Sequence, residues 1–253
     1  MKYDFTNKVV AVTGASGKSM GVTIAKAFLD CGAKVAICSR SLERITAAKE
    51  IVGATDPNRV YATAADLSVA EECIRFIDET VRHFGKIDIL INNAAVQYKE
   101  SALETTVESW DNTMNANARG YFFCMQSAAK DMIKRSEPGV IVNISSGHSL
   151  MAIENRITYA IAKAGVDQMT RSAAREWGPY GIRINTIGAG SFPTAMSREV
   201  LAENDFLSPQ LPLRRRGTLD EIANVCLFMA SDESSYVTGT RLNVDGGYVL
   251  SIT

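Results

Sequence analysis

Tyr159 and Lys163 are the residues of this sequence whose types and spacing point most directly to chemistry. They are four positions apart, and side chains at that spacing lie on one face of a helix. An isolated tyrosine titrates near pKa ~10, and a nearby cation favours the phenolate and lowers that pKa. A tyrosine in this position can give a proton to a carbonyl or take one from an alcohol. The same spacing also occurs on ordinary helices whose lysine extends to solvent, so the rest of the chain must decide between the two interpretations.

The segments around this pair predict an α/β fold. Apolar, β-branched runs typical of strands buried on both faces cover residues 9–12, 35–37, 87–91, 140–144 and 183–187, with weaker runs at 60–63 and 241–244. Segments of helical periodicity lie between them, at residues 22–31, 42–52, 69–84, 106–134, 158–177 and 219–230. This alternation predicts a Rossmann-type, doubly wound parallel sheet with helices on both faces. No repeat or linker divides the chain, so we expect residues 1–253 to form a single domain.

A glycine-containing loop follows the first expected strand and leads directly into a helix. Glycines at that place let the backbone approach a pyrophosphate, which the N-terminus of the helix attracts. The residues expected at this dinucleotide site are Gly14, Ser16, Lys18, Ser19, Met20 and Gly21. The spacing differs from G-x-G-x-x-G, so a plain glycine turn is the alternative interpretation.

The second expected strand ends at Ser39 and Arg40, where a site that prefers NAD carries an acid for the ribose hydroxyls. No acid is present. Arg40 and Lys18 can instead pair with a 2′-phosphate, although two solvated cations near helix starts are the alternative. We therefore predict NADP(H) as the preferred cofactor, with NAD(H) as the second choice.

The next two strand ends carry further candidates. After the third strand come Asp66 and Leu67, where Asp66 can accept from the adenine amino group or cap the following helix. After the fourth come Asn93 and Ala94, which are small enough to lie beneath a cofactor ring; Asn93 can equally be a turn residue. Asn117 lies inside an expected helix, a position that calls for a water-bridged network or simple exposure.

The composition excludes several classes of function. The net charge is −1, and the Lys and Arg residues are dispersed, so no nucleic-acid partner is indicated. No segment is long and apolar enough for a signal peptide or a membrane span, so we expect a cytoplasmic protein without a membrane partner. The five cysteines include no C-x-x-C pair and are expected to be reduced and buried. Two histidines are too few for a His-based metal site; one of them, His148, is either a substrate contact or a loop residue.

These motifs, taken in order, resemble the classical short-chain dehydrogenase/reductase family over about residues 8–249. The resemblance rests on Thr13-Gly14, Asp66-Leu67, Asn92-Asn93-Ala94, Asn117, the strand end Asn143-Ile144-Ser145-Ser146, Tyr159 to Lys163, the segment from Asn185 to Met196, and Asp245-Gly246-Gly247. Ser146 precedes Tyr159 by 13 residues (159 − 146). That is the family's usual separation, and it selects Ser146 over Ser145.

The resemblance implies a role for each matching residue. Tyr159 is the general acid/base and Ser146 hydrogen-bonds the reacting oxygen, while Asn117 holds a water that links Lys163 to solvent. Lys163 lowers the pKa of Tyr159 and, with Tyr159, touches the cofactor ribose. Phe192 and Thr194 lie at the nicotinamide carboxamide. A homotetramer formed through the long helices and the C-terminal segment is also implied.

Three departures from the family pattern bear on the reaction. The glycine loop is one residue longer than usual and leans towards the enoyl-reductase branch. That branch places its tyrosine seven residues before the lysine, where this chain has Arg156, so we retain the carbonyl/alcohol interpretation. Ala95 replaces a glycine after Asn-Asn-Ala, and Ala189 replaces a proline before Gly190.

The sequence therefore predicts an NADP(H)-dependent oxidoreductase that interconverts a ketone and a secondary alcohol on a small or medium organic substrate. Residues 96–99, 147–156 and a lid at about 191–213 are expected to select the substrate. One alternative is a 3-oxoacyl-thioester reductase acting on acyl-carrier protein, which Tyr180 disfavours because a basic residue is usual there. The alternative from another class is a non-catalytic NADP-binding scaffold or redox-sensing regulator.

Overall fold

The computed structural model describes residues 3–17, 19–52, 56, 58–194 and 207–250. Seven strands form one parallel sheet in the order β3-β2-β1-β4-β5-β6-β7. The strands are β1 (Val9–Thr13), β2 (Lys34–Ser39), β3 (Val60–Ala64), β4 (Ile89–Asn92), β5 (Gly139–Ser146), β6 (Ile182–Ala189) and β7 (Arg241–Val244). Both weak strand predictions are confirmed, and both form edges of the sheet, where fewer positions are fully buried.

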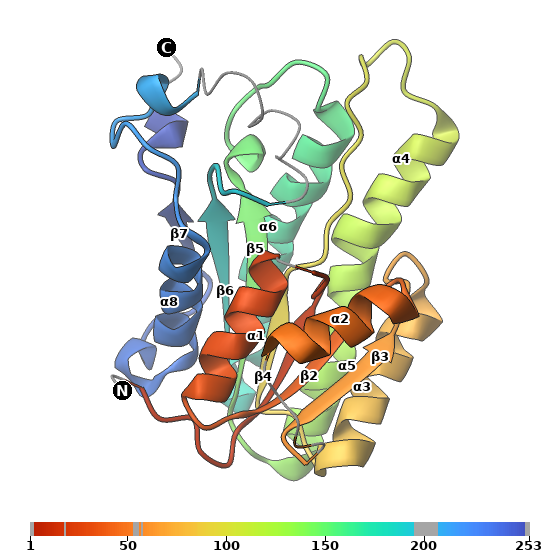
Figure 1. Cartoon of the computed structure of the whole chain (residues 1–253), viewed down its shortest axis with the longest axis vertical. Helices are drawn as coiled ribbons and strands as arrows, with labels where there is room; N and C mark the ends of the chain where they lie inside the picture. The colour runs from red at the N-terminus through yellow and green to blue at the C-terminus, as the bar shows by residue number, and fades with distance from the viewer. Residues whose placement is uncertain (1–2, 18, 53–55, 57, 195–206, 251–253) are drawn as a thin grey trace.

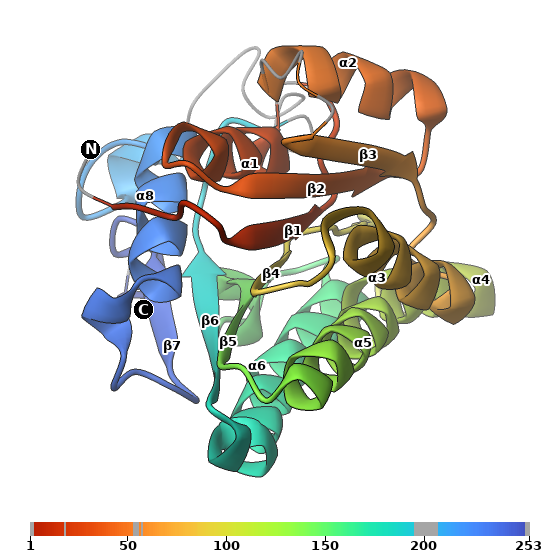
Figure 2. The ribbon, with the colours of Figure 1, turned by 90° about the horizontal axis from the view of Figure 1, so that it is seen from below.

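Helices cover both faces of this sheet (Figures 1 and 2). One face carries α1 (Met20–Asp30), α2 (Leu42–Val52) and α8 (Leu219–Ala230). The other carries α3 (Ala70–Phe84), α5 (Gly120–Arg135) and α6 (Ile157–Trp177). The α4 helix (Val107–Met114) precedes α5, and single 3₁₀ turns cover Gly147–Ser149, Gly178–Tyr180, Ser208–Gln210, Asp232–Ser234 and Tyr248–Leu250. The predicted doubly wound α/β fold is thereby confirmed.

Successive strand residues belong to opposite cores, as the two-residue period of a strand requires. In β1, Val10 and Val12 pack beneath α1 and α8, whereas Ala11 packs towards α3 and α5. A strand buried on both faces needs an unbroken apolar run, and all five residues of β1 are buried. This is why the strands could be recognised from apolar runs in the sequence.

The segment predicted as one helix over residues 106–134 is interrupted. A π-helical turn at Asn115–Arg119 separates α4 from α5, and the amide of Gly120 bonds to the carbonyl of Asn115, five residues earlier. Gly120 packs directly against the carbonyl of Leu67, where any Cβ would collide. Single π turns inside helices often mark functional positions, and this one contains Asn117.

Candidate active site

A cavity of about 990 Å³ opens where the carboxyl ends of the strands meet. This is the place at which doubly wound sheets bind ligands, beside the switch point between β1 and β4. It brings together most of the predicted site residues: Gly14, Ser16, Ser19, Met20, Ser39, Arg40, Asp66, Leu67, Asn93, Ala94, Ser146, Tyr159, Lys163, Phe192 and Thr194. Gly21 and Asn117 lie behind its wall, since neither is among the lining residues. Lys18 and residues 195–206 of the expected lid lie outside the described residues.

The glycine loop forms a backbone cradle at one end of this cavity. Gly14 has φ +73°, and a Cβ there would lie 2.6 Å from Cα of Ala94. A Cβ on Gly21 would lie 2.7 Å from the side-chain amide of Asn93. The hydroxyl of Ser19 caps α1 by accepting from the amides of Ser16 (3.2 Å) and Val22 (3.4 Å). Both glycines therefore let the loop pack directly against the end of β4, and Ser19 and Met20 at the start of α1 line the cavity.

Asn93 fastens this cradle to the end of β4. Its side-chain amide donates to the carbonyls of Thr13 (2.9 Å) and Gly14 (3.2 Å). In return, the Thr13 hydroxyl accepts from the amides of Asn93 and Ala94. The Asn93 side chain therefore bonds the backbone at the end of β1 and not that of its own turn, which differs from the turn interpretation. Thr13, which our sequence reasoning did not select as a site residue, completes the link.

The ends of β2 and β3 border the far part of the cavity. Arg40 is exposed, and Arg44 of α2 lines the same region. Ser39 is buried and donates to the carbonyl of Ser41. Asp66 accepts from the amide (2.9 Å) and hydroxyl (2.7 Å) of Ser68, which forms a local turn before α3. The N-cap of α3 is Val69, which makes no side-chain cap bond, so Asp66 does not cap this helix.

Lys163 is almost wholly buried, with 1% of its surface exposed. Its ammonium donates to the carbonyl of Ile144 (2.8 Å) and to the hydroxyl of Tyr121 (3.0 Å). Burial lowers the pKa of Lys163 to about 7, and the nearby Asp167 opposes this shift. Tyr121, on α5, was not predicted, because nothing in its sequence surroundings distinguishes it from a core aromatic residue.

Tyr159 differs from the sequence-based expectation in its pKa. Burial raises the pKa of Tyr159 to about 12, and the opposing influences are the hydrogen bond from Ser146 and the charge of Arg156. The nitrogen of Lys163 lies 5.8 Å from the centre of the Tyr159 ring. A lysine whose own pKa is near 7 carries less charge at neutral pH, so in this geometry Arg156 is the cation that favours the Tyr159 phenolate.

His148 stands beside the Ser146 hydroxyl. Its Nδ1 lies 3.1 Å from Ser146 Oγ, and its backbone amide donates to the same oxygen at 3.2 Å. The imidazole meets the Tyr159 ring edge to face, with centroids 5.5 Å apart. Burial and, to a smaller extent, Arg156 lower the pKa of His148 to about 4, so the imidazole is neutral at physiological pH. His148 therefore lines the cavity from the turn Gly147–Ser149.

Asn117 is fully buried, and its side chain does not reach the cavity. Its Nδ2 donates to the carbonyl of Val96 (2.7 Å), and its Oδ1 accepts from the amide of Val96 (2.8 Å). These two bonds fix the segment that forms one wall beside Tyr159. Backbone pairing therefore explains the asparagine inside this helical segment, and its burial rules out the exposed interpretation.

A second set of unpredicted residues holds the Ser146 backbone. Arg241 donates to the Ser146 carbonyl at 2.8 Å and to Asp167 Oδ2 at 3.0 Å. Ser149 donates to that carbonyl (2.9 Å) and to the same Asp167 oxygen (2.6 Å). Asp167 and Arg241 are 74 residues apart in the chain, and no local motif marks either one.

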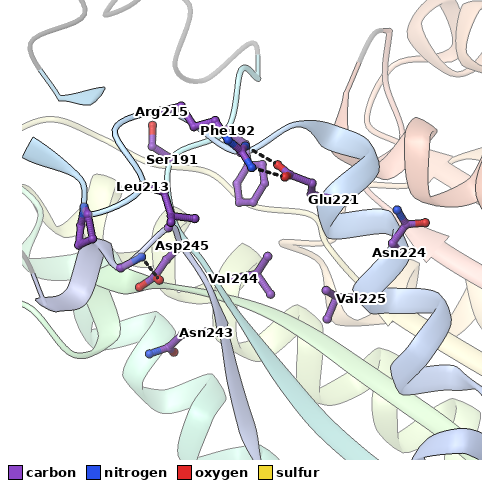
Figure 3. Close-up of a pocket in the computed structure, with 14 residues that line it drawn as sticks. Ser191, Phe192, Leu213, Arg215, Glu221, Asn224, Val225, Asn243, Val244 and Asp245 are labelled. Atoms are coloured by element: carbon purple, nitrogen blue, oxygen red, sulfur yellow. Dashed lines mark hydrogen bonds and ion pairs between the residues drawn. The ribbon is translucent and has the colours of Figure 1, made fainter. Parts of the chain in front are cut away.

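A separate hollow of about 590 Å³ lies near the C-terminal part of the chain (Figure 3). It contains the Arg215–Glu221 ion pair, together with Val225, Val244 and Asp245. It shares Ser191 and Phe192 with the larger cavity, but Tyr159, Ser146 and Lys163 do not line it. The residues expected to transfer a proton therefore line only the larger of these two hollows.

Two classes of site are not found in the part of the chain that the structure describes. None of its helices is both long and apolar enough to pass through a bilayer. Within the same residues, no three His, Cys, Asp or Glu side chains gather in an arrangement suited to a metal ion. All five cysteines are free and buried.

Comparisons with known proteins give similarity over almost the whole chain. A family model described as enoyl-(acyl carrier protein) reductase matches residues 14–249. A gluconate 5-dehydrogenase of Gluconobacter oxydans is 34% identical over 247 residues, which cover 95% of this chain and 94% of the relative. An NAD-dependent glycerol dehydrogenase of Listeria innocua is 32% identical over 250 residues, covering 98% and 96%. The crystal structure of a short chain dehydrogenase from Bacillus anthracis superposes with a TM-score of 0.87 at 34% identity, covering 96% of each chain.

Proposed function

The chain belongs to the short-chain dehydrogenase/reductase family, and from that premise we propose that it interconverts a ketone and a secondary alcohol with NADP(H). It is an oxidoreductase of the class that acts on CH–OH donors. The names of its relatives direct the search for substrates to polyols and hydroxy acids. We further propose that the chain works as one catalytic domain in the cytoplasm.

The observation that carries this proposal is the meeting of Tyr159, Ser146 and Lys163 in one cavity. The Ser146 hydroxyl bonds to Tyr159 and lowers the Tyr159 pKa, whereas burial raises it. A carbonyl oxygen placed between the two hydroxyls would receive a hydrogen bond from Ser146 and a proton from Tyr159. Because the phenol is held neutral at working pH, Tyr159 suits the role of proton donor in the reducing direction.

The ammonium of Lys163 lies close to the Tyr159 ring, 5.8 Å from its centre. Its pKa of about 7 lets the ammonium lose and regain a proton near neutrality, and its bonds to Ile144 and Tyr121 hold it in place. We propose that Lys163, in its protonated form, adds to the stabilisation that the charge of Arg156 gives the phenolate formed after proton transfer. Asn117 contributes indirectly, because it fixes the Val96 wall against which the substrate lies.

The cavity fits a nicotinamide dinucleotide. Gly14, Ser16 and Ser19 line the cavity where α1 begins and would hold the pyrophosphate, and Ala94 lines it next to them. Phe192 and Thr194 lie on the wall nearest Gly190 and Ser191 and would hold the nicotinamide end. When bound, this group gives or takes the hydride; the protein's own part is to orient the substrate and move the proton.

The preference for NADP(H) over NAD(H) rests on Arg40. The end of β2 offers this exposed guanidinium, and Arg44 lines the same region. A guanidinium can donate two parallel hydrogen bonds to the oxygens of a 2′-phosphate, whereas the ribose diol of NAD(H) carries no negative charge for it to bind. A named relative is NAD-dependent, so cofactor titration is the measurement that separates the two.

The direct test adds ketones, polyols and hydroxy acids one at a time and measures the change in absorbance of the reduced cofactor. We expect turnover with at least one of them, and Tyr159→Phe should keep NADPH binding while kcat falls on the order of 10³-fold. Tight NADPH binding without any turnover would favour the non-catalytic scaffold. Turnover of acyl-carrier thioesters alone would favour the 3-oxoacyl reductase alternative.

We also propose a homotetramer. Apolar side chains are exposed on the helices that the family uses for assembly, among them Val107 and Trp110 on α4, Phe122 on α5 and Ile161 on α6. Exposed apolar groups on neighbouring helices favour burial between subunits. Sedimentation of the chain as a monomer at micromolar concentration would contradict this.

A further inference from the structure

The half-buried guanidinium of Arg156 lines the cavity beside the proton-transfer residues. It lies directly before α6, three residues before Tyr159, and is close enough to Tyr159 and His148 to lower the pKa of both. Its charge favours the Tyr159 phenolate, but the proposed proton transfer does not use its hydrogen-bond donors. The question is therefore what this charge binds.

The protein satisfies only part of the guanidinium. Arg156 Nη1 donates to the carbonyls of Asn155 (3.0 Å) and Tyr98 (3.5 Å). Among the described residues, no carboxylate lies within ion-pair distance of Arg156, and its Nε and Nη2 have no protein acceptor. The two carbonyl contacts hold one side of the fork against the cavity wall, so the donors on the other side remain available to a ligand.

The wall around Arg156 is itself fixed. The amide of Glu100 donates to the carbonyl of Asn155 at 3.3 Å, which joins residues 98–100 to the start of α6. Asn117 holds the same segment two residues earlier, at Val96. The position of Arg156 relative to Tyr159 is therefore determined by backbone contacts on both sides, as a specificity-determining residue requires.

The charges on this part of the lining are mainly positive. Lys99 adjoins Tyr98, and Arg216 also lines the cavity, where it donates to the Ser191 hydroxyl. Glu154 is the acidic residue on the same wall; it is exposed and forms no ion pair with Arg156. A fixed guanidinium with unused donors pairs best with a planar carboxylate, to which it can give two parallel hydrogen bonds.

We propose that the substrate carries a carboxylate, which Arg156 binds while the reacting carbonyl lies against Tyr159 and Ser146. The substrate class is thus an oxo acid and its hydroxy acid. This inference rests on the proposed function for the identity of the reacting group, but the binding of the carboxylate can be measured separately.

The experiment compares oxo acids with their uncharged methyl esters. The probes are 2-oxo, 3-oxo, 4-oxo and 5-oxo acids of one chain length, each paired with its ester. We expect kcat/KM for at least one acid to exceed that of its ester by about 10- to 100-fold, the range of a charge-assisted hydrogen bond. Arg156→Gln should abolish this preference by lowering kcat/KM for the acid alone, and Arg156→Lys should restore part of it.

The matched control is Arg171→Gln. Arg171 lies on the exposed face of the same α6 helix, where its side chain bonds to Gln168 within the part of the chain that the structure describes, and its loss changes the net charge by the same amount. It should leave the preference for the acid unchanged. Equal use of acids and esters by the wild type, or equal losses for both in Arg156→Gln, would overturn the proposal. The second result would show that Arg156 acts through Tyr159 instead of on the substrate.

A binding experiment separates this inference from the proposed function. Ligand-observed NMR measures whether the same probes bind to the protein in the presence of NADP⁺. If no probe is turned over, the assigned reaction fails for this class. The carboxylate site would still stand if the wild type binds an acid and Arg156→Gln does not. Absence of acid binding to the wild type, or equal binding by both proteins, overturns it.

Discussion

Gly188 provides the space that the guanidinium of Arg241 occupies, because a Cβ at residue 188 would collide with the guanidinium atoms. In the β6–β7 ladder Arg241 pairs with Thr186 and Asn243 with Gly188, so Arg241 starts two residues before the position opposite Gly188 and its side chain passes over that glycine. From this place Arg241 reaches both the Asp167 carboxylate and the Ser146 carbonyl. The residue proposed to bind the reacting oxygen is thus held by a buried ion pair on the far side of its own backbone.

Arg241→Gln should destabilise the protein by about 2–4 kcal/mol, because it leaves the Asp167 carboxylate buried without its partner. One Asp167 oxygen already lacks a hydrogen-bond partner among the described residues. The free energy of unfolding in urea measures this loss. Combining Arg241→Gln with Asp167→Asn should recover part of it, and strictly additive losses would contradict a coupled pair.

Ser146→Ala should lower kcat on the order of 10²-fold, since it removes the hydroxyl that faces Tyr159. The control is Ser145→Ala. Ser145 Oγ donates to the backbone carbonyl of Lys163 at 3.2 Å, so this change should alter kcat by less than about 10-fold. Steady-state kinetics on both variants gives the two values of kcat. A larger fall in kcat for Ser145→Ala than for Ser146→Ala would show that the wrong serine was selected.

Arg40→Asp should exchange the cofactor preference, because a carboxylate can accept from the ribose hydroxyls and repels a 2′-phosphate. We expect the Kd for NADPH to rise by about 10-fold or more, while the Kd for NADH falls. Fluorescence titration of the protein with each cofactor provides the values. Unchanged affinity for NADPH would mean that Arg40 does not meet the phosphate.

Gly14→Ala should abolish dinucleotide binding and destabilise the loop, because Gly14 has a positive φ and a Cβ there would press on the Ala94 backbone. Gly165→Ala is the matched control. Gly165 lies within α6, and a Cβ there would meet nothing within 4 Å, so this change should leave binding intact and stabilise the helix by up to ~1 kcal/mol. Thermal unfolding with and without NADPH reports both effects.

His148 should make stability depend on pH. Its pKa is about 4 in the folded protein, below the ordinary 6.5, so between these values the unfolded chain binds more protons. The free energy of unfolding therefore rises as pH increases from 4 to 6.5 and is lost as pH falls through that window. We expect about 1–2 kcal/mol, reduced from the full linkage value because His148 is only partly buried. His148→Asn should remove this part of the slope in urea titrations, and an unchanged slope would refute the assignment.

The sequence by itself determined the features that depend on local periodicity. An apolar run such as Val9–Thr13 is a property of neighbouring residues, and so is the four-residue spacing of Tyr159 and Lys163. The alternation of strands and helices along the chain could therefore be predicted, and so could the placement of both side chains on one helix. The glycine loop was recognisable for the same reason, because glycines that lie close together in the sequence indicate a backbone conformation that other residues rarely adopt.

The tertiary structure decided what the side chains bind. The Asn117 side chain pairs with the Val96 backbone, 21 residues away. Tyr121 meets Lys163 across 42 residues, and Arg241 meets Ser146 across 95. Such contacts exist only because parallel strands bring their carboxyl ends to one edge of the sheet, and no local pattern encodes which side chains arrive there together. Burial, which raises the pKa of Tyr159 and lowers that of Lys163, likewise results from the packed fold and not from the four-residue spacing.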